Sequence, residues 1–78
     1  MPEWMMITDA ERADIEKRFT YHTPTGNQPE QYEAIRTRAF NMATVIVALT
    51  PQSNEQAIAL TNLEQAVMWA NAAIARNG

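Results

Sequence analysis

The sequence contains no cysteine, only two glycines and a single histidine among its 78 residues. The lack of cysteine excludes disulfide bridges and thiolate metal sites, and two isolated glycines cannot form a glycine-rich phosphate loop. His22 has no cysteine partner and no organised carboxylates, so a hydrogen-bonded loop residue explains it better than a metal ligand or catalytic base. The sequence therefore predicts no metal, no cofactor and no enzymatic activity.

Long apolar runs and an excess of positive charge are also missing. The longest apolar run, Met42 to Leu49, is interrupted by Thr44 and is far shorter than the roughly 18 residues that span a bilayer. Glu3 lies ahead of Met5, so the start lacks the basic region of a secretory signal. The net charge is −3, whereas non-specific binders of long nucleic acids are normally basic. We expect an intracellular protein without membrane or long nucleic acid partners, whose arginines could still hold a small anion.

Helical patterns are present throughout the chain. In the N-terminal segment, residues 1–20, Thr8 and Glu11 have the spacing of a capping box and open a short helix of about residues 9–19. A loop of residues 21–28 follows and is rich in turn formers. The next helix spans residues 29–50, with Pro29 at its first position and Asn27 or Gln28 as its cap.

The last helix spans residues 53–77, and Ser53 with Gln56 forms a second capping box. Each long helix has a heptad seam, and the short connection between them predicts an antiparallel hairpin. The fold class is therefore all-α, a single domain of residues 1–78 with a short N-terminal helix and a two-helix hairpin. The seams are Tyr32, Ile35, Ala39, Met42, Ile46 and Leu49 on one helix and Leu60, Leu63, Val67, Ala70 and Ile74 on the other.

Each long helix also has a second apolar stripe that ends in an arginine. A hairpin can cover only one face of each helix, and a chain this short buries too little surface to be comfortably stable alone. The N-terminal helix could cover one stripe but not both, so we expect a homo-oligomer. The stripes are Arg36, Phe40, Ala43 and Val47 on the first long helix and Ala66, Trp69, Ala73 and Arg76 on the second.

The hairpin predicts which residues are neighbours. If the turn is centred near Gln52, positions whose numbers sum to about 103 lie side by side, which places Asn71 beside Tyr32. The open end of the hairpin should then gather four residues: Tyr21, His22, Gln28 and Arg76.

Tyr21 and Arg36 suggest a nucleotide site more sharply than any other pair. An aromatic ring can stack on a base, and arginine can stack on the base or hold a phosphate. Structural explanations stay open, however. Tyr21 could anchor the loop, Arg36 could pair with Glu33, and Arg76 could suit the negative end of its own helix.

Two signatures resemble those of the anti-CBASS type 2 cyclic-oligonucleotide sponges of bacteriophages. The resemblance covers residues 19–77, about three quarters of the chain, and its second signature is long and specific; residues 1–18 match nothing in the family pattern. The first signature is Tyr21-His22-Thr23-Pro24, then Gln28 and Tyr32-Glu33-Ala34-Ile35-Arg36; the second is PQSNEQA at 51–57 and LTNLEQAVMWANAAIARN at 60–77.

The resemblance implies a compact hexamer in the host bacterial cytoplasm. Members bind cyclic dinucleotides, such as cyclic GMP-AMP, in pockets between protomers, and cyclic trinucleotides, such as cyclic tri-AMP, in separate pockets. They hold these messengers without cleaving them, so the immune effector is never activated.

The resemblance also implies two sets of site residues. Tyr21 matches the family's base-stacking aromatic, and His22 adjoins it. Arg36 stands where a basic residue, lysine in some members, contacts the dinucleotide, so arginine here could alter base preference. For the trinucleotide pocket the candidates are Arg76, Arg38 and Asn77.

Two other functions fit parts of the same pattern. A phage structural or adaptor protein would share the seams and surplus faces but would bind no nucleotide. A phosphodiesterase would destroy the messenger instead of holding it.

Overall fold

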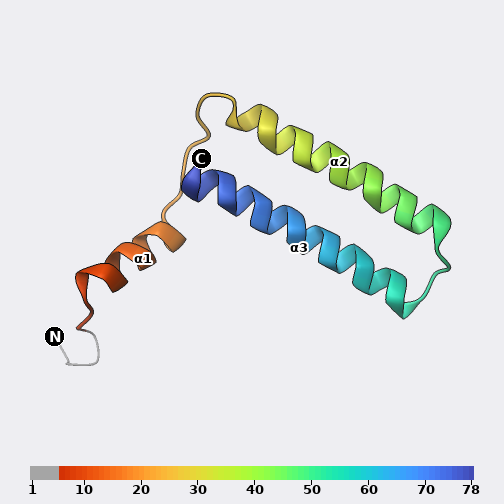
Figure 1. Cartoon of the computed structure of the whole chain (residues 1–78), viewed down its shortest axis with the longest axis horizontal. Coiled ribbons are helices and arrows are strands. Elements are labelled where there is room, and N and C mark those ends of the chain that lie inside the picture. The colour runs from red at the N-terminus through yellow and green to blue at the C-terminus, as the bar shows by residue number, and fades with distance from the viewer. Residues whose placement is uncertain (1–5) are drawn as a thin grey trace.

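A computed structural model describes residues 6–78 and contains three helices: α1 (Asp9–Phe19), α2 (Gln28–Leu49) and α3 (Asn54–Asn77). Helices α2 and α3 run antiparallel as a hairpin, and α1 extends from its open end, close to the C-terminus (Figure 1). No strand occurs in this part of the chain. These features confirm the predicted all-α class, with a short first helix and a hairpin. None of the helices in residues 6–78 is long and apolar enough to cross a membrane.

Helix α1 begins at the predicted capping box. The Glu11 N–H donates to Thr8 Oγ1 at 3.1 Å, and the Thr8 N–H donates to Glu11 Oε1 at 2.8 Å. The bond from the Thr8 backbone N–H, and to a lesser extent the Thr8 hydroxyl, holds the pKa of the Glu11 carboxyl below its usual range. Every residue of α1 is exposed, so local hydrogen bonds, and not burial, stabilise this helix.

The starts of α2 and α3 differ from the sequence prediction. Asn27 takes the N-cap position of α2 without a side-chain bond, and Pro29 is the second residue of the helix. Gln28 instead accepts from the Thr25 N–H at 3.0 Å and donates weakly to the Ile74 carbonyl at 3.4 Å. Gln28 therefore ties the loop to the end of α3, which confirms the predicted register at the open end of the hairpin.

Only half of the second predicted capping box forms. Ser53 Oγ accepts from the Gln56 N–H at 3.2 Å, as the pattern indicates. The Gln56 side chain does not return to Ser53; its amide donates to the Thr50 carbonyl at 3.1 Å and to the Thr50 hydroxyl at 2.9 Å. Gln56 therefore fastens the closed end of the hairpin across the turn.

The seam of α3 forms as predicted, but that of α2 drifts. Met42 is 52% exposed and Leu49 is 78% exposed, whereas Ala43 is partly buried in their place. A straight helix of 3.6 residues per turn moves about 20° per heptad from a 3.5-residue repeat, which explains the shift from Met42 to Ala43. The partly buried residues of α2 are Gln28, Tyr32, Ile35, Ala39, Ala43 and Ile46.

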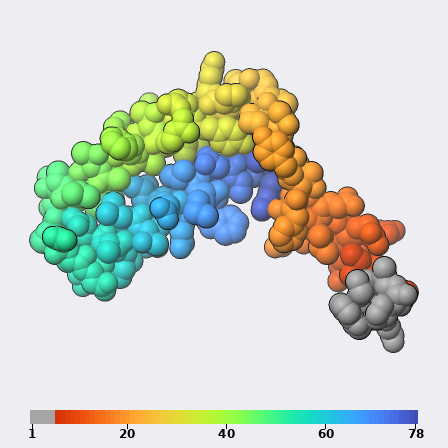
Figure 2. Space-filling model, turned by 180° about the vertical axis from the view of Figure 1, so that it is seen from behind, coloured from red at the N-terminus to blue at the C-terminus, as the bar shows by residue number. Residues whose placement is uncertain are grey.

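One copy of the chain exposes far more surface than a compact protein of its size. No described residue is fully buried, and α1 protrudes from the hairpin (Figure 2). The large residues of the apolar stripes, Phe40, Val47 and Trp69, are all exposed. The radius of gyration is 17.9 Å, against about 11.5 Å for a compact chain of this length. The accessible surface is 6598 Å², against roughly 4,800 Å² for a folded monomer of this mass. The excess favours association with other copies.

Candidate functional site

A hollow of about 410 Å³ lies at the open end of the hairpin. The end of α1, the loop after it and the two long helices all contribute to its walls, so it depends on the hairpin register. The lining residues are Arg18, Thr20, Tyr21, His22, Pro24, Tyr32, Asn71, Ala72, Ala75 and Arg76.

Three of the four residues predicted to gather at the open end line this hollow: Tyr21, His22 and Arg76. The Tyr21 side chain is 81% exposed, so its ring is free to stack on a planar ligand. Gln28, the fourth, does not line the hollow, because its amide is engaged with Thr25 and Ile74. An exposed aromatic ring beside an arginine can hold a base and a phosphate of one ligand.

Arg36 lies outside this hollow. Its guanidinium donates to the Glu33 carboxylate one turn away, and its side chain is 70% exposed. An exposed ion pair of this kind contributes about 0–1 kcal/mol, so Arg36 remains available to a stronger anionic partner. Among residues 6–78 of one copy, Arg36 is therefore not one of the residues that line the open-end hollow with Tyr21.

The three candidates for a trinucleotide pocket lie in two places. Arg76 and Asn77 line a hollow of about 190 Å³ with Trp69, Ala72 and Ala73. Arg38 lines a separate groove of about 440 Å³ between α2 and α3, where it is the only charged residue. The remaining walls of that groove are apolar: Ala34, Ile35, Ala39, Leu63, Ala66, Val67 and Ala70.

Asn71 lines the open-end hollow, but its sequence position did not predict it as a candidate ligand-binding residue. It lines the open-end hollow with Tyr32, as the register predicts, but its Oδ1 atom is enclosed and has no hydrogen-bond partner among the described residues. A buried acceptor without a partner lowers the stability of the fold by about 1–3 kcal/mol. A ligand that donates a hydrogen bond to this oxygen would recover that free energy. The signal in the sequence is an asparagine in the otherwise alanine-rich stretch from Ala70 to Ala73.

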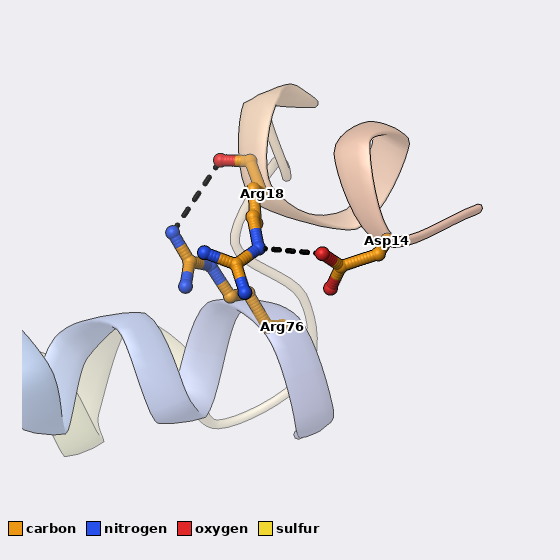
Figure 3. Close-up of polar contacts among 3 residues, drawn as sticks. All are labelled: Asp14, Arg18 and Arg76. Atoms are coloured by element: carbon orange, nitrogen blue, oxygen red, sulfur yellow. Dashed lines mark hydrogen bonds and ion pairs between the residues drawn. The ribbon is translucent and has the colours of Figure 1, made fainter. Parts of the chain in front are cut away.

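Arg76 connects α3 to α1. Its Nη2 donates to the Arg18 carbonyl at 3.4 Å, and Arg18 Nε donates to Asp14 Oδ2 at 2.8 Å (Figure 3). Arg18 belongs to the last turn of α1 and Arg76 to the last turn of α3. The C-terminal ends of both helices therefore meet at the open-end hollow.

The sequence profile of the Acb2/Tad1 hairpin domain matches residues 11–75. The chain belongs to this family. It is the family of anti-CBASS protein 2, whose members are sponges for cyclic oligonucleotides and not enzymes. The Acb2/Tad1 match begins inside α1, so the prediction that residues 1–18 lie wholly outside the family pattern was wrong. Comparison with curated proteins and with solved structures gives no match.

Proposed function

We propose that this member of the Acb2/Tad1 family binds cyclic di- and trinucleotide second messengers and holds them without cleaving them. The observation that carries the proposal is the open-end hollow, where the exposed ring of Tyr21 lies with the cations Arg18 and Arg76. The family supports a cyclic oligonucleotide as the ligand.

The chemistry of the hollow suits one nucleotide unit of such a ring. Stacking of a base on an aromatic side chain contributes about 1–3 kcal/mol. Arg76 can bind the phosphodiester through charge-assisted hydrogen bonds. Asn71 and the Tyr32 hydroxyl lie in the same hollow, and an asparagine amide can pair with the edge of adenine.

Two copies of the chain would fit a cyclic dinucleotide better than one. This ligand has two bases and two phosphates, and a two-fold pair of copies presents two Tyr21 rings and two Arg36 guanidinia. Arg36 of one copy would then complete the site around Tyr21 of the other. We place Tyr21, His22 and Arg36 in the dinucleotide site, and Arg76, Arg38 and Asn77 in the trinucleotide site; Arg76 lines both the open-end hollow and the hollow beside Asn77, so it can contribute to each.

The surplus surface supports assembly into a homo-oligomer, which we propose to be a hexamer. The excess of roughly 1,800 Å² over a compact monomer exceeds the roughly 800 Å² that each partner buries in a standard interface. One interface would therefore not cover it, and several would.

Capture acts by mass action in the cytoplasm of the infected bacterium. A sponge lowers the free messenger only if its sites outnumber the messenger and bind it more tightly than the effector does. The immune effector then stays inactive while the ligand stays intact.

Native mass spectrometry with and without a mixture of cyclic GMP-AMP and cyclic tri-AMP tests the proposal. We expect a hexamer mass that increases by several intact ligands. An oligomer that binds neither ligand would overturn the proposal and favour an adaptor that only mediates assembly. Chromatography of ligand recovered after denaturation provides the second test, because linear products would identify a phosphodiesterase.

A further inference from the structure

The region between α1 and α3 contains more positive than negative side chains. A hollow of about 370 Å³ lies here, lined by Asp14, Lys17, Arg18, Trp69, Arg76 and Asn77. It contains three cationic side chains and one carboxylate, although the chain as a whole has a net charge of −3. Arg18 and Arg76 line both this hollow and the Tyr21 hollow, so the two cations stand between them.

The charge of the helix ends does not neutralise these cations. Helices α1 and α3 both end here, and each C-terminus contributes a partial charge of roughly −0.5. Together with Asp14 they offset about two of the three positive charges. Among the residues that line this hollow, about one positive charge is left for an anionic partner.

The hydrogen bonds of Arg18 leave part of its guanidinium available to an anionic ligand. Its Nε donates to Asp14 Oδ2 at 2.8 Å, which orients the guanidinium (Figure 3). Both residues line the hollow. In the bonds formed among residues 6–78, the Nη atoms of Arg18 have no acceptor. The bond that Arg76 donates to the Arg18 carbonyl is 3.4 Å long. It is therefore weaker than an ordinary N–H···O bond of about 2.7–3.2 Å. A charged acceptor would displace it readily.

We propose that Arg18 binds the phosphodiester of the cyclic oligonucleotide together with Arg76, and that α1 is therefore part of the ligand site. This inference rests on the proposed function. No residue of α1 is buried, so the helix adds nothing to a core. Ligand binding by Arg18 would give this helix a function. Asp14 acts as a positioning residue, because it orients Arg18 without reaching the ligand itself.

Titration calorimetry with cyclic GMP-AMP and with cyclic tri-AMP tests the assignment on the full chain. For each ligand that the unmodified protein binds, we expect Arg18→Ala to weaken affinity about ten-fold or more, the effect of a charge-assisted hydrogen bond. Arg12→Ala is the matched control, because Arg12 lies on the same exposed helix and its substitution removes the same charge. Equal affinities of the two variants would overturn the assignment.

Asp14→Asn separates binding from a merely structural role. If Arg18 acted only by holding α1 through Asp14, this variant would lose as much affinity as Arg18→Ala. If Arg18 binds phosphate, the amide oxygen at position 14 still accepts from Arg18 Nε and the guanidinium keeps its own contact with the ligand, so the affinity stays close to that of the unmodified protein. Native mass spectrometry and circular dichroism of each variant serve as controls, because they test whether the assembly and the helices are intact. If the unmodified protein binds neither ligand, the proposed function itself is refuted, whereas equal affinities of Arg18→Ala and Arg12→Ala refute only the role of Arg18.

Discussion

The two ends of the hairpin have opposite compositions. Between residues 39 and 63, which form the closed end, Glu55 is the only charged residue; every other acidic or basic residue lies outside this stretch. The closed end exposes large apolar side chains, with Phe40 at 72% and Leu49 at 78%. The open end instead gathers the charged and aromatic side chains of Arg18, Tyr21 and Arg76 around one hollow.

This difference separates two tasks along one pair of helices. An apolar surface that a single copy leaves bare is suited to contact with other copies. A hollow with an exposed aromatic ring and two arginines is suited to a charged, planar ligand. Changes to the exposed apolar side chains should therefore alter assembly, and changes to Arg18, Tyr21 or Arg76 should alter binding within an intact assembly.

The largest effect should follow from Phe40→Asp. Phe40 lies at the edge of an apolar groove of about 440 Å³, with Ala43, Thr44, Val47, Ala48 and Leu60. The substitution loses about 1.5–3 kcal/mol of apolar burial per copy and places a charge, which is costly to bury, in the interface. Light scattering after size-exclusion chromatography should show smaller species. Gln52→Glu, which adds the same charge in the exposed turn, should keep the original mass, and an unchanged mass for Phe40→Asp would show that this groove is not an interface.

Trp69→Ala tests where the apolar interface stops. Trp69 is 69% exposed and belongs to the second stripe of α3, close to the open end. We expect weaker assembly, by about 2 kcal/mol per copy, because buried tryptophans dominate interface energies. Its neighbour Met68 is 62% exposed but lies off the stripe, so Met68→Ala should leave the midpoint of dissociation on dilution unchanged. A normal oligomer mass for Trp69→Ala at all concentrations would contradict the prediction.

Tyr21→Ala should weaken dinucleotide binding and leave the oligomer intact. The expected loss is about 1–3 kcal/mol, the contribution of one stacked base. Tyr21→Phe keeps the ring and should retain most of the affinity in titration calorimetry. If Tyr21→Ala binds as tightly as the unmodified protein, Tyr21 is only a loop anchor.

The sequence predicts the helices well because their determinants are local. The seam of α3 and the Thr8 capping box need only the spacing of residues within one element, and both form as expected. The heptad rule fails at Met42, since a hairpin of this kind does not supercoil enough to keep a strict 3.5-residue repeat. Gln56 also departs from its motif, because the Thr50 carbonyl and hydroxyl across the turn offer it two acceptors.

The site is harder to predict because it joins distant segments. The register places Tyr21 and Arg76 at the same end, but nothing in the spacing shows that Arg18 would reach the same hollow. That contact depends on the direction in which α1 leaves the loop. The unpaired oxygen of Asn71 is likewise a property of packing and not of the local pattern.

The smallest effect concerns α1, which stands outside the packed hairpin and depends on its own cap. The Thr8 N–H and hydroxyl lower the pKa of Glu11 from its ordinary value of 4.5. A lowered pKa in the folded state means that the cap stabilises α1 fully above the unfolded value, and that this stability is lost as the pH falls through the lowered value. NMR titration of the Glu11 carboxyl should therefore show a midpoint below 4.5, with the Thr8 amide signal moving in step. Glu11→Gln keeps an acceptor but does not titrate, so in this variant the Thr8 amide should no longer respond to acid. A Glu11 midpoint at or above its ordinary value would mean that the first turn of α1 is not held by its capping box, and the position of Arg18 would then need another support.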